Sequence, residues 1–92
     1  MVIALDYDRT YTEDPALWDA FIDSASVAGH RVICVTMRYP YEGADVERHL
    51  SHRVHEITYT SRARKRDYLE SLGIAVQVWI DDKPELIVSE AA

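Results

Sequence analysis

The sequence has little of several residue types that define particular protein classes. Its 92 residues include one cysteine, three glycines and three prolines, and no apolar run approaches the roughly 20 residues of a membrane span. A single cysteine excludes an internal disulfide, and the place of Cys34 within an apolar run predicts a small buried side chain in a reducing compartment. The low glycine and proline content argues against collagen-like and low-complexity chains. We therefore expect an ordinary globular protein.

Basic residues are also few beside acidic ones. Ten lysines and arginines face sixteen aspartates and glutamates, which gives a formal net charge of −6. This balance argues against a non-specific nucleic-acid coat protein and against a polybasic membrane binder. The opening residues, MVIALDYD, place acids where a signal peptide would continue its apolar stretch. The sequence thus predicts a cytoplasmic protein, without membrane association, whose residues 1–92 form one domain.

Short apolar runs alternate with helical patterns along the chain. The apolar runs predict strands over residues 2–5, 31–36, 56–60 and 76–80. Between them, helices are predicted from Asp14-Pro15 to Gly29, along the stripe Val46, Leu50 and Val54, and from a Ser61 cap to Gly73, with a last turn at Pro84. This alternation predicts an α/β fold with right-handed crossovers and a parallel sheet.

Polar residues follow the predicted strands at the edge where such sheets bind ligands. They are Asp6 and Asp8, Thr36 and Arg38, Thr60 and Ser61, and Asp81 and Asp82. Two acids held close together repel each other unless a cation neutralises them or one keeps a proton. A few carboxylates with no nearby cysteine or histidine suit Mg²⁺ better than Zn²⁺. One such pair is typical of helix caps and solvated loops, whereas two pairs at one edge favour a magnesium site.

Four motifs stand in order along the chain. Residues 6–10 read Asp-Tyr-Asp-Arg-Thr, residues 32–36 are an apolar strand ending in Thr36, Lys65 precedes the last strand, and residues 79–82 read Trp-Ile-Asp-Asp. Together they resemble the motifs of the haloacid dehalogenase-like (HAD) phosphohydrolases, from residue 2 to about residue 85. The resemblance implies a three-layer, Rossmann-like parallel sheet of about four to five strands.

The resemblance also implies a mechanism. Asp6 would attack phosphorus and form an aspartyl-phosphate, and Asp8 would protonate the leaving oxygen and later activate water. Thr36 and Lys65 would hold the phosphoryl oxygens. The expected activity is that of a Mg²⁺-dependent phosphatase acting on a nucleotide, a nucleic-acid end or a phosphoprotein.

The magnesium ligands implied by the resemblance are Asp6, the main-chain carbonyl of Asp8, and a carboxylate from Asp81 or Asp82. Asp82 is the preferred direct ligand, because Asp-Asp-Lys-Pro resembles the Asp-Asp/Asn-Ser-Pro form of capless protein phosphatases. The choice between the two neighbours stays open at this point.

Some positions depart from the family pattern. Arg9 stands where the family usually has glycine, which puts the local turn in doubt. Arg38, in Thr-Met-Arg, resembles the Thr-Gly-Arg form of the second motif and is predicted to hold substrate phosphate, with an exposed loop arginine as the alternative. Arg9 and Arg64 are further candidates for substrate binding. The run Arg62, Arg64, Lys65 and Arg66 is either a phosphate-binding patch or the solvated face of a helix.

No cap domain is expected. Only six residues separate Asp8 from Pro15, too few for the inserted cap that selects substrates in many relatives. An open site suggests a macromolecular phosphorylated substrate, or one enclosed by a second subunit, and a homodimer would also protect a poorly covered sheet edge. The tyrosines Tyr7, Tyr11, Tyr39 and Tyr41 are candidates either for stacking a base or for core packing.

Two alternatives from other classes stay open. A receiver-like phosphoacceptor uses similar groups, but its aspartate normally follows the third strand, which here ends in Tyr59-Thr60. A catalytically idle HAD-like binding or assembly module is the second alternative, with Arg9 as the residue that would obstruct the site.

The histidines His49, His52 and His55 recur at helical spacing and form either a polar helix face or, less typically, a zinc site.

Overall fold

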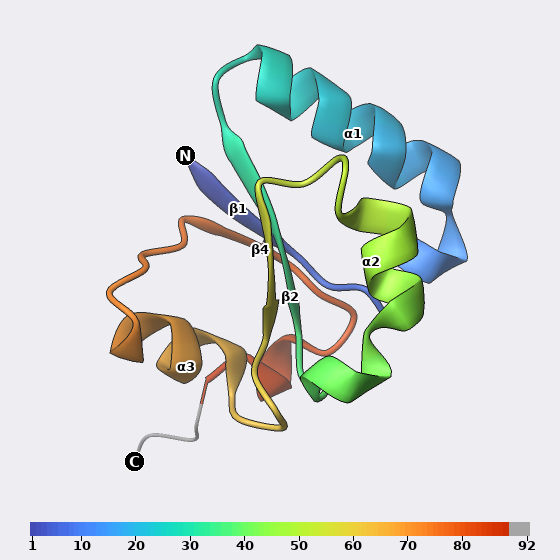
Figure 1. Ribbon diagram of the computed structural model, residues 1–92. Helices are drawn as coiled ribbons and strands as arrows, with labels where there is room; N and C mark the ends of the chain where they lie inside the picture. The colour runs from blue at the N-terminus through green and yellow to red at the C-terminus, as the bar shows by residue number, and fades with distance from the viewer. Residues whose placement is uncertain (89–92) are drawn as a thin grey trace.

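The computed structural model describes residues 1–88, which form one parallel α/β sheet with helices around it (Figure 1). The sheet has the strand order β3-β2-β1-β4, and all its described pairings are parallel. Its strands are β1 (Val2–Leu5), β2 (Arg31–Thr36), β3 (Glu56–Tyr59) and β4 (Val78–Ile80). The helices are α1 (Pro15–Val27), α2 (Ala44–Leu50) and α3 (Lys65–Ser71), with 3₁₀ turns at Tyr11–Glu13, Pro40–Glu42 and Pro84–Leu86. The predicted α/β class and parallel sheet are confirmed, and the layout is compatible with a Rossmann-like fold.

The central strand β1 pairs with β2 and β4, so the carboxyl ends of these three strands lie side by side. Leu5, its last residue, pairs with Cys34 of β2 on one side and with Ile80 of β4 on the other. The backbone N–H of Asp6 donates to the carbonyl of Ile80 at 2.9 Å, which extends this contact one residue further. The residues that follow β1, β2 and β4 therefore emerge at one edge, which we call the carboxyl edge of the sheet.

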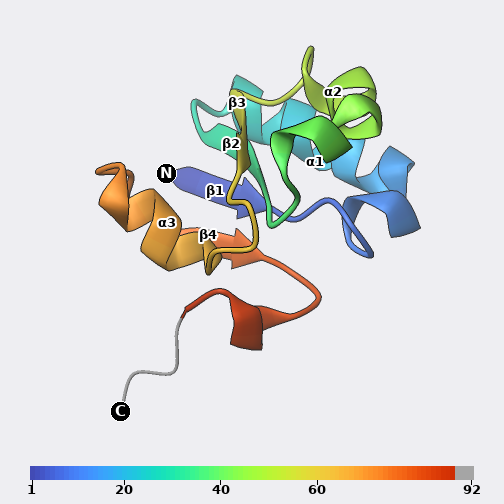
Figure 2. The same ribbon diagram turned by 60° about the horizontal axis from the view of Figure 1, so that its bottom comes forward.

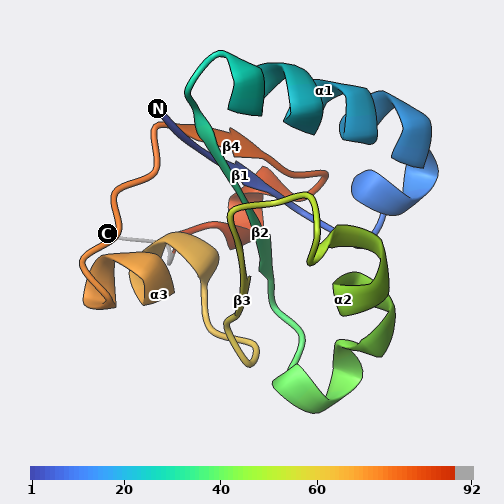
Figure 3. The ribbon, with the colours of Figure 1, turned by 45° about the horizontal axis from the view of Figure 1, so that its top comes forward.

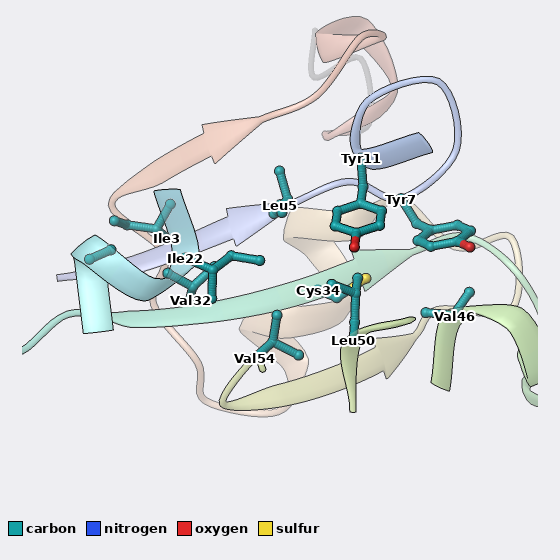
Figure 4. Packing of buried hydrophobic residues seen from close by; sticks show 11 residues of the cluster. Ile3, Leu5, Tyr7, Tyr11, Ile22, Val32, Cys34, Val46, Leu50 and Val54 are labelled. Carbon is teal, nitrogen blue, oxygen red and sulfur yellow. The ribbon is translucent and has the colours of Figure 1, made fainter. Parts of the chain in front are cut away.

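Alternate residues of each strand face two separate hydrophobic clusters. On one face, Ile3 and Leu5 pack with Ile22 of α1 and Leu50 of α2 (Figure 4). On the other face, Ala4 packs with Leu69 of α3. The ribbons show the same arrangement, with α1 and α2 on one side of the sheet and α3 on the other (Figure 2 and Figure 3). Burial on both faces explains why the β1 and β2 sequences are almost continuously apolar.

Helix α1 has the ends that its sequence predicts. The Asp14 carboxylate accepts a hydrogen bond from the Leu17 N–H at 3.2 Å, and Pro15 occupies the first turn, where its missing N–H costs nothing. At the other end Gly29 has φ +88°, and the His30 N–H donates to the Ala25 carbonyl at 3.0 Å. This is the left-handed helix ending for which glycine is the favoured residue.

The third helix differs from its prediction. It begins at Lys65 and not at a Ser61 cap, because Ser61 and Arg62 have φ values of 53° and 73°, in the left-handed region. The Thr60 hydroxyl donates to the Ala63 carbonyl at 2.7 Å and closes this turn. The extra turn shifts the start of α3 so that Lys65 stands at its first position, facing the carboxyl edge.

Two other elements are shorter than predicted. Helix α2 ends at Leu50, and Val54, expected on the same stripe, is buried in the turn that follows. Strand β4 starts at Val78, two residues later than predicted. None of the described helices is both long enough and apolar enough to span a membrane.

Candidate active site at the carboxyl edge

A cleft of about 280 Å³ opens at the carboxyl edge of the sheet. It is lined by residues that follow all four strands and by the first residue of α3. Eight of the residues predicted for the site line it, namely Asp6, Asp8, Arg9, Thr36, Arg38, Lys65, Asp81 and Asp82. Sequence reasoning gave no role to three others that line it, Met37, Lys83 and Leu86. Lys83 directly follows the acidic motif Asp81-Asp82, and this position could have indicated that Lys83 lines the site.

A buried lysine joins two aspartates at the base of this cleft. The Lys65 Nζ donates to Asp6 Oδ1 at 2.7 Å and to Asp81 Oδ2 at 2.5 Å. The side chains of Lys65, Asp6 and Asp81 are 5%, 9% and 6% exposed, so water screens the three charges little. Removing one partner of such a group leaves an uncompensated buried charge, which is strongly destabilising.

This environment shifts the pKa values of both partners. Burial raises the pKa of Asp6 from 3.8 to about 6, against the lowering effect of Lys65, and the nearby Asp81 charge raises it further. Burial alone would lower the pKa of Lys65, but the carboxylates of Asp6 and Asp81 outweigh it, so this pKa is raised. At neutral pH the lysine is charged and Asp6 is largely ionised, as a nucleophilic carboxylate must be.

Three carboxylates at this edge could hold a divalent cation. Asp6, Asp81 and Asp82 each offer an oxygen, and these oxygens lie within 4.8 Å of one another. Asp81 already accepts from Lys65 and from the Lys83 N–H, at 2.9 Å, through its two different oxygens. Asp82 is exposed and accepts neither of these bonds. A set of oxygen donors only is of the kind that Mg²⁺ prefers, so the residues present fit that ion.

The guanidinium of Arg38 uses every one of its N–H donors inside the protein. Nε and Nη2 donate to the two carboxylate oxygens of Asp8 at 3.0 and 2.8 Å. Nη1 donates to the Glu42 carbonyl at 2.6 Å and to Asp45 at 2.7 Å, and Nη2 reaches the other Asp45 oxygen at 3.4 Å. An arginine has five N–H donors, and all five have acceptors here. Arg38 was predicted to hold substrate phosphate, but in the structure it holds Asp8.

Asp8 itself stays accessible. Its side chain is 52% exposed at the mouth of the cleft, while its two oxygens are fixed by Arg38. The Asp8 carboxylate lies outside the group of three acids that come within metal-binding distance of one another. The structure therefore separates Asp8, held by an arginine, from Asp6, held by a lysine.

Arg9 adopts a backbone conformation that glycine favours, at the position where the motif that the chain resembles usually has glycine. Its φ is +63°, the left-handed region in which glycine is favoured, so the turn that follows Asp8 is formed although the residue is arginine. The Arg9 N–H donates to the Thr12 hydroxyl at 3.0 Å, which holds the turn. Beside it, the Thr10 hydroxyl donates to Asp6 Oδ2 at 3.1 Å.

The remaining predicted residues divide into those at the cleft and those away from it. Thr36 ends β2 at the cleft, and its hydroxyl accepts from the Arg38 N–H at 3.3 Å. Arg64 immediately precedes α3, and among the described residues Arg62 lines the cleft whereas Arg64 does not. The positive φ of Arg62 turns the chain at that point, which a sequence pattern does not reveal.

Several other candidates are structural. Tyr7 and Tyr11 are buried and stacked, with ring centroids 5.6 Å apart, and the Tyr7 hydroxyl lies 2.7 Å from His49 Nδ1. Cys34 is buried in the core, and burial raises its pKa to about 12, so its thiol is not a nucleophile at neutral pH. Within residues 1–88, the group of side chains close enough to share a metal contains no histidine.

No protein-family model matches the chain, and no curated protein or solved structure matches it either. The case for a function therefore depends on the residues and distances described above.

Proposed function

We propose that the chain is a minimal, capless HAD-like domain, a three-layer α/β structure, that acts as a Mg²⁺-dependent phosphatase. One observation carries this proposal: Lys65 contacts both Asp6 and Asp81, although Lys65 and Asp6 are 59 positions apart in the sequence. Residues of all four motifs that resemble those of the phosphohydrolases thus line one cleft, Thr36 representing the second motif. A set of acids that served only as helix caps or loop solvation would have no reason to share a buried lysine.

The first half of the reaction uses Asp6 and Asp8. An Asp6 oxygen attacks phosphorus and forms an O–P bond, while the bond from phosphorus to the leaving oxygen breaks. Asp8 gives its proton to that leaving oxygen. Lys65 has three N–H donors and spends two on Asp6 and Asp81, which leaves one for a phosphoryl oxygen. The Thr36 hydroxyl keeps its own proton to donate to a second phosphoryl oxygen.

The second half returns the enzyme to its starting state. Asp8, now ionised, takes a proton from a water molecule, the water oxygen attacks phosphorus, and the Asp6–phosphorus bond breaks. Phosphate leaves, Asp6 is again a carboxylate and Asp8 is again an acid. Arg38 orients Asp8 for both steps because it fixes both oxygens of the carboxylate.

Asp6, Asp82 and the main-chain carbonyl of Asp8 would hold Mg²⁺. The bound ion would neutralise charge on the phosphoryl group, where most catalysis of such transfers resides. Asp81 would serve beside them by holding Lys65, since its two oxygens accept from Lys65 and from the Lys83 N–H.

A catalytically idle HAD-like binding module is the second candidate, and one observation favours it. The carboxylates of both Asp6 and Asp8 are already engaged by cations of the protein, Lys65 and Arg38. Such pairing lowers the nucleophilicity of Asp6, and both oxygens of Asp8 already accept hydrogen bonds from Arg38. Turnover decides between the two candidates.

The test is release of p-nitrophenol from p-nitrophenyl phosphate, measured with Mg²⁺, with EDTA, and with Asp6→Asn in place of the wild type. We expect release that needs both the metal and Asp6. Asp23→Asn makes the same chemical change on α1, where Asp23 pairs with Arg53 outside the cleft, and should leave the rate unchanged. Release that survives Asp6→Asn would remove Asp6 as the nucleophile. Absence of release from aryl, nucleotide and peptide phosphates alike would favour the binding module.

A further inference from the structure

Two stacked tyrosines stand beside the cleft. The rings of Tyr39 and Tyr41 have centroids 5.5 Å apart and planes inclined by 23°, and Tyr41 is 83% exposed. Both belong to the segment that connects β2 to α2, just after the cleft residues Met37 and Arg38. The pair is therefore an aromatic surface at the side of the cleft and is not part of either hydrophobic cluster.

The cleft residue Arg62 holds Tyr39, the inner ring of the pair. The Arg62 guanidinium carbon lies 5.2 Å from the centroid of the Tyr39 ring, a cation–π contact. Its Nη2 donates to both carboxylate oxygens of Glu42 at 3.0 and 3.1 Å, and its Nη1 donates to the Met37 carbonyl at 2.9 Å. Glu42 also accepts from the Tyr39 N–H at 2.8 Å. These bonds hold Tyr39 in place before any ligand arrives, and the Tyr41 ring stacks on it.

Core packing does not account for Tyr41. Tyr7 and Tyr11, also candidates for stacking, are 1% and 3% exposed and do pack in the core. Tyr41 leaves its ring in water, although an exposed aromatic face gains free energy when another flat ring covers it. The sequence did not separate these tyrosines by role, and their exposure does.

Cations without acidic partners lie in the same cleft. Arg9 and Lys83 line it, and within the described residues neither side chain makes a hydrogen bond or ion pair. Among the cleft-lining residues five are cationic and four are acidic, although the whole chain has a net charge of −6. Arg9 and Lys83 thus offer two positive charges that no acid among residues 1–88 pairs with, which suits the phosphate of a small substrate.

We propose that the Tyr39–Tyr41 pair is a stacking surface for a nucleobase, so that the substrate class is a nucleoside phosphate. The phosphate would enter the cleft near Arg9 and Lys83, and the base would lie on Tyr41. This inference rests on the proposed phosphatase function, because it assigns the group attached to the phosphate that the cleft would hydrolyse. The source of the base, a free mononucleotide or the end of an oligonucleotide, is separated by the experiment.

The experiment compares adenosine 5′-monophosphate with ribose 5-phosphate, which has the same sugar and phosphate but no base. The quantity measured is the ratio of the two kcat/KM values for the wild type, Tyr41→Ala and Tyr41→Phe. We expect the wild type to prefer the nucleotide, and Tyr41→Ala to reduce that preference by about 5- to 150-fold, the range for loss of one base–aromatic stack. Tyr41→Phe keeps the ring and should keep the preference. Val27→Ala, at an equally exposed position on α1, is the matched control.

A second measurement does not depend on turnover. Calorimetry on the Asp6→Asn protein should show tighter binding of adenosine 5′-monophosphate than of ribose 5-phosphate, and Tyr41→Ala should remove the difference. Base-dependent binding without hydrolysis by the wild type would refute the phosphatase and leave the stacking surface standing. If both compounds are hydrolysed and the ratio of their kcat/KM values is the same in the wild type and all variants, the stacking surface is refuted and the phosphatase stands.

Two further substrates complete the test. A short 5′-phosphorylated oligonucleotide hydrolysed better than the mononucleotide, with the same dependence on Tyr41, would assign the base to a nucleic-acid end. A phosphoseryl peptide preferred over both nucleotides, in a manner lost in Tyr41→Ala, would overturn the proposal in favour of a protein substrate.

Discussion

At the scale of single residues, the contacts of Arg38 differ most from the role that its sequence position predicts. Its position after Thr36 favours phosphate binding, but all its N–H donors already have acceptors, two of them the oxygens of Asp8. A guanidinium matches a carboxylate in a planar, two-bond arrangement that lysine cannot reproduce. We therefore assign Arg38 as a positioning residue for Asp8.

This assignment predicts how Arg38→Lys affects catalysis. If Arg38 orients the general acid, its loss should matter most when the leaving group needs a proton. Because kcat/KM reports only the steps up to loss of the leaving group, we expect it to fall by on the order of 10²-fold for an alkyl phosphate and by much less for 2,4-dinitrophenyl phosphate. Steady-state kinetics with the two substrates checks this. An equal loss for both, accompanied by a raised KM, would show instead that Arg38 contacts the substrate phosphate.

At the scale of elements, local sequence signals predicted the ends of α1 and the span of β2 because those signals act locally. A carboxylate before proline and a glycine after the helix fix the ends of α1 through bonds to neighbouring residues. The start of α3 was missed because Ser61 and Arg62 adopt positive φ, a conformation that neither residue type favours. Tertiary contacts of that turn impose it, including the bond from the Arg62 N–H to the Met37 carbonyl at 2.8 Å.

Two glycines test how the elements are joined. Gly29 has φ +88° and open space where a Cβ would be, so Gly29→Ala should cost only backbone strain, about 1 kcal/mol. Gly43 has an ordinary φ of −99°, but a Cβ there would overlap the Tyr59 ring, whose hydroxyl donates to Glu47 at 2.6 Å. We expect Gly43→Ala to cost more, about 2–3 kcal/mol, because α2 and β3 must move apart.

Urea denaturation of the two glycine variants measures this difference in the free energy of unfolding. The wild type is the reference, and an unchanged m-value would show that only stability has changed. A Gly43→Ala protein as stable as Gly29→Ala would mean that the Tyr59 ring moves away freely and does not fix α2 against β3.

At the scale of the whole molecule, the strand order explains why the site could be predicted in outline. Because β1 lies between β2 and β4, the acids after β1 and β4 and the threonine that ends β2 must meet at one edge. Alternation of strands and helices predicts that meeting without any knowledge of side chains. The contacts of Arg38 with Asp8 and Asp45, and the choice of Arg62 over Arg64, depend on loop geometry and rotamers. They became visible only in the folded chain.

Stability measurements can distinguish the roles of the neighbouring acids Asp81 and Asp82. Asp81 holds the buried Lys65, so Asp81→Asn should lower the metal-free free energy of unfolding by about 2 kcal/mol, on the order of 10 °C in Tm. Asp82 is exposed, so Asp82→Asn should leave the metal-free Tm nearly unchanged. Its effect should appear only when Mg²⁺ is added.

A cation that binds the folded state alone raises stability by RT ln(1 + [Mg²⁺]/Kd), about 2.7 kcal/mol at one hundred times Kd. Thermal melts with increasing Mg²⁺ should therefore show a rising Tm for the wild type and for Asp81→Asn, and a nearly flat one for Asp82→Asn. The opposite pattern would make Asp81 the direct ligand. A wild-type Tm that does not change with Mg²⁺, Mn²⁺ or Ca²⁺ would mean that Asp6, Asp81 and Asp82 bind no cation, because Lys65 already compensates their charge. The proposed phosphatase would then have no metal site.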